Sequence, residues 1–139
     1  MRRKRWATTL LGSILLAQGV GKLLSPSGYF QALERFRILP AIPLIGSIWI
    51  ALELLAGLGL LAAGLVKTPS RRFVPFAAIA LLLQLGYAFL SISAYVRGLE
   101  ITNCTCFGIY LAQRLSWFVL VQDAYMIVYA AWQLIKLAR

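Results

Sequence analysis

The sequence predicts an all-α integral membrane protein, a four-helix bundle with a short interfacial helix after the first span. Of its 139 residues, 61% are hydrophobic and the mean hydropathy is +0.82, against roughly half apolar residues in a soluble domain. The apolar residues fall in four long segments, and the length of each suffices for the ~20 residues that a helix needs to cross a bilayer. Only 13% of residues are charged, yet the net charge is +10. Because the basic residues lie at the ends of apolar segments, they indicate membrane anchoring and not nucleic-acid binding.

The first span is predicted over residues 6–24, behind the basic stretch Met1–Arg5. A basic start followed by an apolar run also occurs in signal peptides, but no small-residue cleavage site follows this run. Residues 25–28, Ser-Pro-Ser-Gly, have the composition of a turn. From residue 29 to 38 apolar residues recur at near-helical spacing with polar residues between them, which predicts a short helix on the membrane surface.

Three further spans are predicted over residues 41–66, 73–96 and 116–134, within a single membrane domain, 1–139. A basic turn at 67–72 separates the second span from the third, and a cysteine loop at 97–115 separates the third from the fourth. The second span is rich in small residues that favour close helix packing: Ala56, Gly57, Gly59, Ala62, Ala63 and Gly64.

The basic residues also predict the orientation. With the N-terminus inside, nine basic residues lie on the inner side and five on the outer side. The positive-inside rule therefore predicts that both termini lie in the cytoplasm. This orientation is the one expected of a multi-pass protein in a bacterial inner (cytoplasmic) membrane. The cysteine loop then lies outside, where disulfides persist. The inner residues are Arg2, Arg3, Lys4, Arg5, Lys67, Arg71, Arg72, Lys136 and Arg139; the outer ones are Lys22, Arg35, Arg37, Arg97 and Arg114.

Cys104 and Cys106 are the only cysteines, and the chain has no histidine. A disulfide between cysteines this close is strained, and strained, exposed disulfides exchange readily. The pair therefore predicts redox chemistry, with a structural disulfide or two unpaired thiols as the alternatives. A metal site is disfavoured, because two sulfurs need two further ligands. Haem is disfavoured because no histidine can ligate the iron.

Polar side chains inside the predicted spans form a second set of candidates. Glu53 lies near the middle of the second span, and Gln18 and Gln84 lie at similar depth in the first and third. A carboxyl group inside a span is costly and indicates function. It would serve as a proton relay, a hydrogen-bonding group for a quinone or the partner of a cation. The structural alternative is interhelical hydrogen bonding that holds the bundle together.

Gln122 and Asp123 lie about two turns into the fourth span from the outer side. The same functional roles apply to Asp123. The structural alternative is an ion pair near the outer face with one of three basic residues: Lys22, Arg97 or Arg114.

Motifs around the cysteines carry a family resemblance. The step Arg97-Gly98, the motif Cys104-x-Cys106-Phe107-Gly108 and the final apolar span resemble the methylamine utilisation protein MauE family, within the DoxX-like four-span membrane proteins. The family commonly carries glycine between the cysteines, where this chain has the stiffer Thr105. Other matching residues are Lys22, Pro26, Pro43, Glu53, Leu54 and Gly57.

The resemblance implies a four-helix membrane bundle with its cysteines on the periplasmic side. MauE is linked to maturation of the disulfide-rich small subunit of methylamine dehydrogenase, beside a thioredoxin-like partner. DoxX-like relatives are linked to thiol redox chemistry and to quinone reduction. These links imply that a quinone receives electrons from the cysteines, within a protein that also contacts membrane lipid.

The favoured hypothesis is thus a membrane thiol–disulfide redox and maturation protein that exchanges with a periplasmic thioredoxin-like protein through Cys104 and Cys106. Arg97 and Arg114 flank the loop and are expected to lower a cysteine pKa. Gly98, Phe107 and Gly108 complete the expected loop support. The alternative is a non-catalytic accessory or assembly subunit of a larger membrane complex, with a structural disulfide and the small residues of the second span as its docking face.

Overall fold

The structure is a computed structural model that describes residues 2–66, 71–108 and 110–139. Every regular element in these ranges is helical, which confirms the all-α class. Residues 67–70 of the predicted basic turn lie outside the described residues. The elements are α1 (Arg2–Leu23), α2 (Pro26–Glu34), α3 (Ile42–Leu65), the 3-10 turn η1 (Arg71–Phe73), α4 (Val74–Val96) and α5 (Trp117–Ala138).

Three helical segments are long and apolar enough to cross a membrane singly: Ile42–Leu65, Arg71–Val96 and Trp117–Ala138. The N-terminal segment reaches this threshold only as a bent pair, in which α1 and α2 meet at 94°. The described residues therefore contain three spanning candidates, or four when the bent pair is counted as one span. The helix bounds lie close to the predicted segments, although the last helix continues beyond residue 134 to Ala138.

The bend between α1 and α2 follows from local sequence. Pro26 occupies the first turn of α2, where its missing N–H costs little, and it keeps Ser25 out of the helical region, at φ −143° and ψ 74°. The short helix begins earlier than predicted, at Pro26, and ends at Glu34. Its apolar face is covered by the bundle: Tyr29, Leu33 and the following Phe36 are buried in a cluster with side chains of α3, α4 and the cysteine loop.

Close contact between α1 and α3 depends on glycine. A Cβ added at Gly12 would lie 2.6 Å from the backbone nitrogen of Leu61, so only glycine lets the two backbones approach. Gly64 faces α1 in the same way, and Gly59 faces the ring of Phe76 from α4. These small residues of α3 are therefore covered by the chain's own helices, which corrects the expectation that they form a docking face for another protein.

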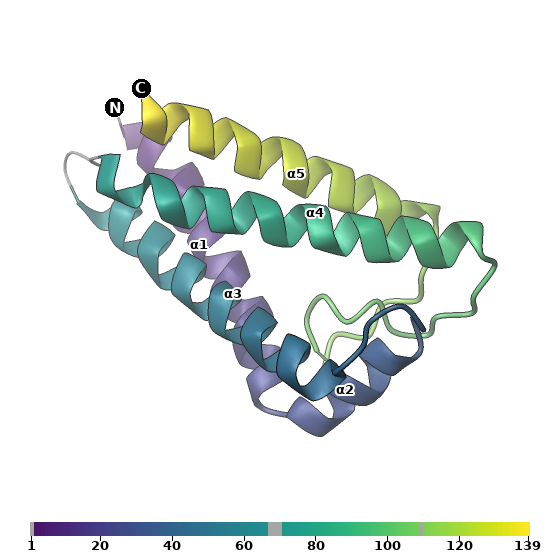
Figure 1. Cartoon of the computed structure of the whole chain (residues 1–139). Coiled ribbons are helices and arrows are strands. Elements are labelled where there is room, and N and C mark those ends of the chain that lie inside the picture. Colours follow the sequence, from purple (N-terminus) through teal and green to yellow (C-terminus); the bar gives the residue numbers. More distant parts are fainter. Residues whose placement is uncertain (1, 67–70, 109) are drawn as a thin grey trace.

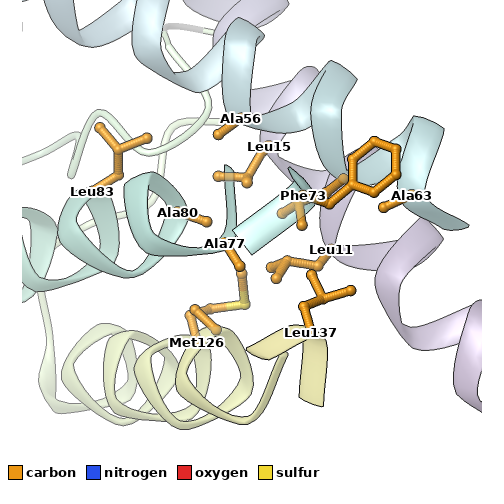
Figure 2. Close-up of a cluster of buried hydrophobic side chains, with 12 residues drawn as sticks. Leu11, Leu15, Ala56, Ala63, Phe73, Ala77, Ala80, Leu83, Met126 and Leu137 are labelled. Atoms are coloured by element: carbon orange, nitrogen blue, oxygen red, sulfur yellow. The ribbon is translucent and has the colours of Figure 1, made fainter. Parts of the chain in front are cut away.

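All four long helices contribute to one apolar core (Figure 2). Leu11 and Leu15 of α1 meet Ala77 of α4 and Met126 of α5 at its centre. The outward faces of the same helices are also apolar, as expected of surfaces that contact lipid. Side chains more than half exposed include Leu44, Leu58, Leu82, Phe89, Trp117, Phe118 and Val128.

The two ends of the bundle differ in what they carry (Figure 1). The start of α1 and the end of α5 lie at one end, next to the end of α3 and the start of α4. Helix α2 and the loop between α4 and α5 lie at the opposite end. The cysteines, which belong to this loop, are therefore held at the end far from the termini.

Candidate functional site

A buried ion pair joins α1 to α3 near the end that carries the cysteine loop. Lys22 Nζ lies 2.6 Å from Oε1 and 2.7 Å from Oε2 of Glu53, and both side chains are 0% exposed. The Tyr87 hydroxyl from α4 accepts a hydrogen bond from Lys22 and donates one to Glu53. Three helices are thus connected by one charged network, and both carboxylate oxygens of Glu53 are engaged.

Aromatic rings surround this network. Lys22 Nζ lies 4.6 Å from the ring centroid of Tyr87 and 5.4 Å from that of Tyr29, within cation–π range. The ring of Trp49 packs edge-on against Tyr87, with centroids 5.2 Å apart. A lone buried charge would be very costly. Here the opposite charge, the hydroxyl and the ring faces together replace the solvation that Lys22 loses.

The network confirms interhelical hydrogen bonding as a role of Glu53 and identifies its partner, which the sequence analysis missed. Lys22 was assigned to the outer surface or to Asp123; the structure instead places it inside the bundle on Glu53. The sequence held a signal for this pairing, because Lys22 and Glu53 are opposite charges within apolar segments.

The cysteine loop is closed at its base by backbone hydrogen bonds. Cys104 N donates to Gln113 O at 2.8 Å, and Leu115 N donates to Ile101 O at 2.9 Å. Within the loop, the Asn103 side chain accepts a hydrogen bond from the Thr105 backbone at 2.9 Å and donates to Gly108 O at 2.9 Å. The loop therefore has a defined shape that its own polar groups maintain.

Thr105, between the two cysteines, has a φ of +67°, and its side chain is buried. Positive φ is strongly disfavoured for a β-branched residue. The Thr105 hydroxyl donates to Cys104 O at 2.6 Å, which compensates part of this cost. The backbone conformation explains why glycine suits this position and shows that the threonine adopts it nonetheless.

The loop rests directly on the end of α1. Gly108 has a φ of +71°, and a Cβ there would lie 2.6 Å from Gly21 O. Gly21 in turn faces Phe107 O: a Cβ added at Gly21 would lie 2.5 Å from this oxygen. Because Gly21 precedes Lys22, this contact fixes the cysteine loop beside the ion pair.

The two sulfur atoms lie 3.4 Å apart as free thiols. Cys104 is 3% exposed and Cys106 is 4% exposed, which corrects the expectation of an exposed disulfide. They pack in one buried cluster with Tyr87 and with Val119 of α5. The thiols are therefore inside the bundle, next to the tyrosine of the Lys22–Glu53 network.

The two thiols differ in acidity. A hydrogen bond from the Cys106 thiol lowers the pKa of Cys104 to about 7. The same hydrogen bond, followed by burial, raises the pKa of Cys106 well above its ordinary value. Cys104 is therefore the thiolate of the pair near neutral pH, and Cys106 keeps its proton.

The arginines flanking the loop do not act on the cysteines as expected. Arg97 donates to the backbone carbonyls of Phe36 and Ser93, and Arg114 is exposed. The lowered pKa of Cys104 comes first from Cys106 instead. Arg97 thus connects the end of α4 to the segment after α2. Gly98, at φ +66°, has nothing within 4 Å of an added Cβ and only turns the chain.

Asp123 is buried at 4% exposure, and its Oδ2 has no hydrogen-bond partner among the described residues. The hydroxyl of Ser91, on α4, lies within hydrogen-bonding reach of the carboxyl group. Lys22 pairs with Glu53 instead, and Arg97 donates to backbone carbonyls, so the structure does not support the alternative in which Asp123 pairs with one of these residues.

The glutamines differ from one another. Gln18 and Gln84 are almost fully buried, one turn from Lys22 and Tyr87 respectively, and each has one side-chain atom without a hydrogen-bond partner among the described residues. Gln122 is only half-buried. Polar groups thus collect around the ion pair and the thiols, in the half of the bundle near the loop.

A groove of about 600 Å³ lies at the other end of the bundle. It is far from the thiols, so it takes no part in this site. Its lining residues are Arg5, Trp6, Thr9, Leu10, Ser13 and Gly64.

Comparison with known protein families adds to this geometry. The sequence profile of the methylamine utilisation protein MauE family matches residues 4–136. The chain belongs to the MauE family. Comparison with curated protein sequences and with solved structures finds no match. The part that matches MauE contains the ion pair, the cysteine loop and all three helices that qualify singly as spans, so this is a multi-pass membrane protein.

Proposed function

We propose that the protein is a membrane thiol–disulfide redox and maturation protein that exchanges disulfides with a partner protein through Cys104 and Cys106. The observation that carries the proposal is a pair of thiols 3.4 Å apart with different acidities. A nucleophilic thiolate beside a second thiol that keeps its proton is the arrangement that disulfide exchange requires.

The exchange starts when the Cys104 thiolate attacks a disulfide of the partner. A bond forms between Cys104 and one partner sulfur, and the second partner sulfur leaves as a thiolate. Cys106 then loses its proton and attacks Cys104, which closes the intramolecular disulfide and releases the first partner sulfur. Two electrons pass from the cysteine pair to the partner, whose disulfide becomes a dithiol.

The reverse reaction oxidises a partner dithiol, and this direction suits maturation of a disulfide-rich client. The pair then ends as a dithiol and needs an oxidant before the next cycle. A quinone is the class of oxidant that the family resemblance implies; it takes two electrons and two protons and becomes a quinol. The partner in this scheme is a thioredoxin-like protein.

Access to the buried sulfurs requires the loop to open. Its closure depends on the two backbone hydrogen bonds at its base, and its centre holds Thr105 in a disfavoured conformation. Such backbone strain is common where a segment has to change shape during function. The proposal therefore includes opening of the loop by the docked partner.

We also propose that the loop faces the periplasm and that both termini are cytoplasmic. The burial of Lys22 in the ion pair removes one basic residue from the outer count. Four remain: Arg35, Arg37, Arg97 and Arg114. The excess of basic residues at the end that carries the termini is therefore larger than the sequence alone implies.

The burial of both sulfurs favours a second candidate, an accessory subunit whose cysteines are structural. Trapping experiments separate the two candidates. A Cys106→Ser variant should accumulate a mixed disulfide between Cys104 and its partner, which reductant releases. The matched Cys104→Ser variant should accumulate far less, since burial still raises the pKa of Cys106 in the absence of Cys104. Full activity of the partner pathway in the double serine variant would refute the redox role.

The side of the membrane is tested separately. A membrane-impermeant thiol reagent is added to intact cells that contain the chain, with and without the partner. Labelling of Cys104 from outside supports the proposed orientation, and labelling only after the cells are opened contradicts it.

A further inference from the structure

Closing the disulfide poses a problem that the two cysteines cannot solve themselves. In the dithiol, its hydrogen bond to Cys104 and its burial raise the pKa of Cys106, and burial still does so once Cys104 is bound to the partner. The Cys106 proton must leave when Cys106 attacks. Because Cys106 is only 4% exposed in the closed loop, a side chain inside the bundle is better placed than bulk water to accept this proton as the loop closes.

Two carboxyl groups lie inside the bundle, and their hydrogen bonds distinguish them. Both oxygens of Glu53 accept hydrogen bonds from Lys22, and one of them also accepts a hydrogen bond from Tyr87. Both oxygens of Glu53 therefore already accept hydrogen bonds within a network that joins three helices. Asp123, by contrast, has an oxygen with no hydrogen-bond partner among the described residues, at 4% exposure.

The packing places Asp123 close to the thiols. Val119 packs in the same buried cluster as both cysteines, and Asp123 follows one turn later on the same face of α5. On the facing helix α4, Tyr87 belongs to that cluster, and Ser91, one turn away, reaches Asp123. Asp123 therefore lies on the face of α5 that packs toward the thiols, and its carboxyl group acts electrostatically on both of them.

We propose that Asp123 accepts the proton of Cys106 as the intramolecular disulfide closes. The carboxylate becomes a carboxylic acid, the Cys106 sulfur forms its bond to Cys104, and the sulfur previously bound to Cys104 leaves with the electron pair. In the reverse reaction Asp123 returns the proton to Cys106. The inference rests on the proposed exchange function and adds a general base to it.

The charged and titratable groups around the thiols are compatible with this role. Asp123 acts electrostatically on both cysteines, Tyr87 of α4 packs against them, and Lys22 of α1, paired with Glu53 of α3, acts on Cys106. Lys22 and Glu53 neutralise each other. During closure Asp123 loses its negative charge by taking up the proton, and the leaving sulfur gains one. No new net charge is therefore created in the apolar interior.

A dipyridyl disulfide tests the inference on the purified chain, because each exchange step releases one coloured pyridinethione. The first release reports attack by Cys104, and the second reports attack by Cys106. In an Asp123→Asn variant we expect a first release no slower than in the wild type, because loss of the carboxylate favours the Cys104 thiolate, and a second release slowed by about 100-fold. An Asp123→Glu variant should restore much of the second step. Gln122→Ala, on the same helix, is the control and should alter neither step.

Infrared difference spectra give an independent readout on the wild-type chain. Conversion of dithiol to disulfide should produce the band of a protonated carboxylic acid, and this band should be missing in Asp123→Asn. A wild-type second release without the band, or equal second releases in wild type and Asp123→Asn, would overturn the role of Asp123. Absence of both releases in the wild type, together with absence of a mixed disulfide in the Cys106→Ser trapping experiment, would instead refute the redox function itself.

Discussion

Lys22 Nζ lies 2.6 and 2.7 Å from the two carboxylate oxygens of Glu53, and neither side chain is exposed. The two residues are 31 positions apart in the chain and join α1 to α3. The cysteine loop rests on α1 at Gly21, immediately before Lys22. The ion pair therefore stabilises the part of α1 against which the cysteine loop packs.

Removing one member of this ion pair should destabilise the protein strongly. Lys22→Met leaves Glu53 as an uncompensated buried charge, and Glu53→Gln does the same to Lys22. Each single variant should lower the free energy of unfolding by about 3–5 kcal/mol. Denaturant titration of the protein in detergent measures the change.

The double variant Lys22→Met, Glu53→Gln is the control for this experiment. Because it leaves no unpaired charge, it should lose much less stability than the two single variants added together. Additive losses would show that Lys22 and Glu53 do not depend on each other in the folded protein.

The acidity of Cys104 should depend on Cys106. With a pKa of about 7, the Cys104 thiolate fraction rises through neutral pH, and so should the rate of alkylation by a small neutral reagent. Cys106→Ala removes the hydrogen bond that lowers this pKa, so the midpoint of the rate profile should move to higher pH. Cys106→Ser keeps a hydroxyl donor and should move it less. A midpoint that is the same in the wild type and Cys106→Ala would contradict the pairing of the thiols.

The two glycines at positive φ should respond differently to substitution. The Cβ that Gly98→Ala adds has open space around it. This variant should therefore lower the free energy of unfolding only by the cost of an alanine in the left-handed conformation, about 1–2 kcal/mol. Gly108→Ala carries the same cost, and its Cβ also meets Gly21 O at 2.6 Å, which adds roughly 1–3 kcal/mol of overpacking. Unfolding of both variants is compared in one detergent. Equal losses would mean that the loop does not rest on α1.

Thr105 offers a test of backbone strain. Both Thr105→Gly and Thr105→Ala remove the hydroxyl that donates to Cys104 O, but only glycine accepts a φ of +67° without strain. Thr105→Gly should therefore be more stable than Thr105→Ala by about 1 kcal/mol. In an ordinary loop the flexible glycine is the less stable of the two, so a reversed order in thermal unfolding would argue against strain at this position.

Much of the fold could be predicted from the sequence. The positions of the helices, the bend before Pro26 and the membrane class depend on hydropathy and on local backbone preferences, which can be read along a single segment. The sequence also identified the candidate functional residues Cys104, Cys106, Glu53 and Asp123, because reactive or charged residues are few in an apolar chain.

Contacts between distant segments were not visible. The sequence offered Lys22 as a partner for Asp123, while the folded chain joins Lys22 to Glu53 and leaves an oxygen of Asp123 without a partner among the described residues. It also left open an exposed, strained disulfide, a structural disulfide or two unpaired thiols; in the folded chain the loop folds inward and buries two free thiols. Each outcome depends on how helices far apart in the chain pack together.

The sequence by itself determined that this is an all-helical membrane protein of the MauE family with one pair of cysteines. Only the tertiary structure decided that Glu53 pairs with a cation, whereas Asp123 has an oxygen without a hydrogen-bond partner among the described residues. The physical reason is that composition and periodicity act locally, whereas the environment of a buried charge or thiol is created by neighbours from other helices. In this protein those neighbours come from α1, α3, α4 and α5.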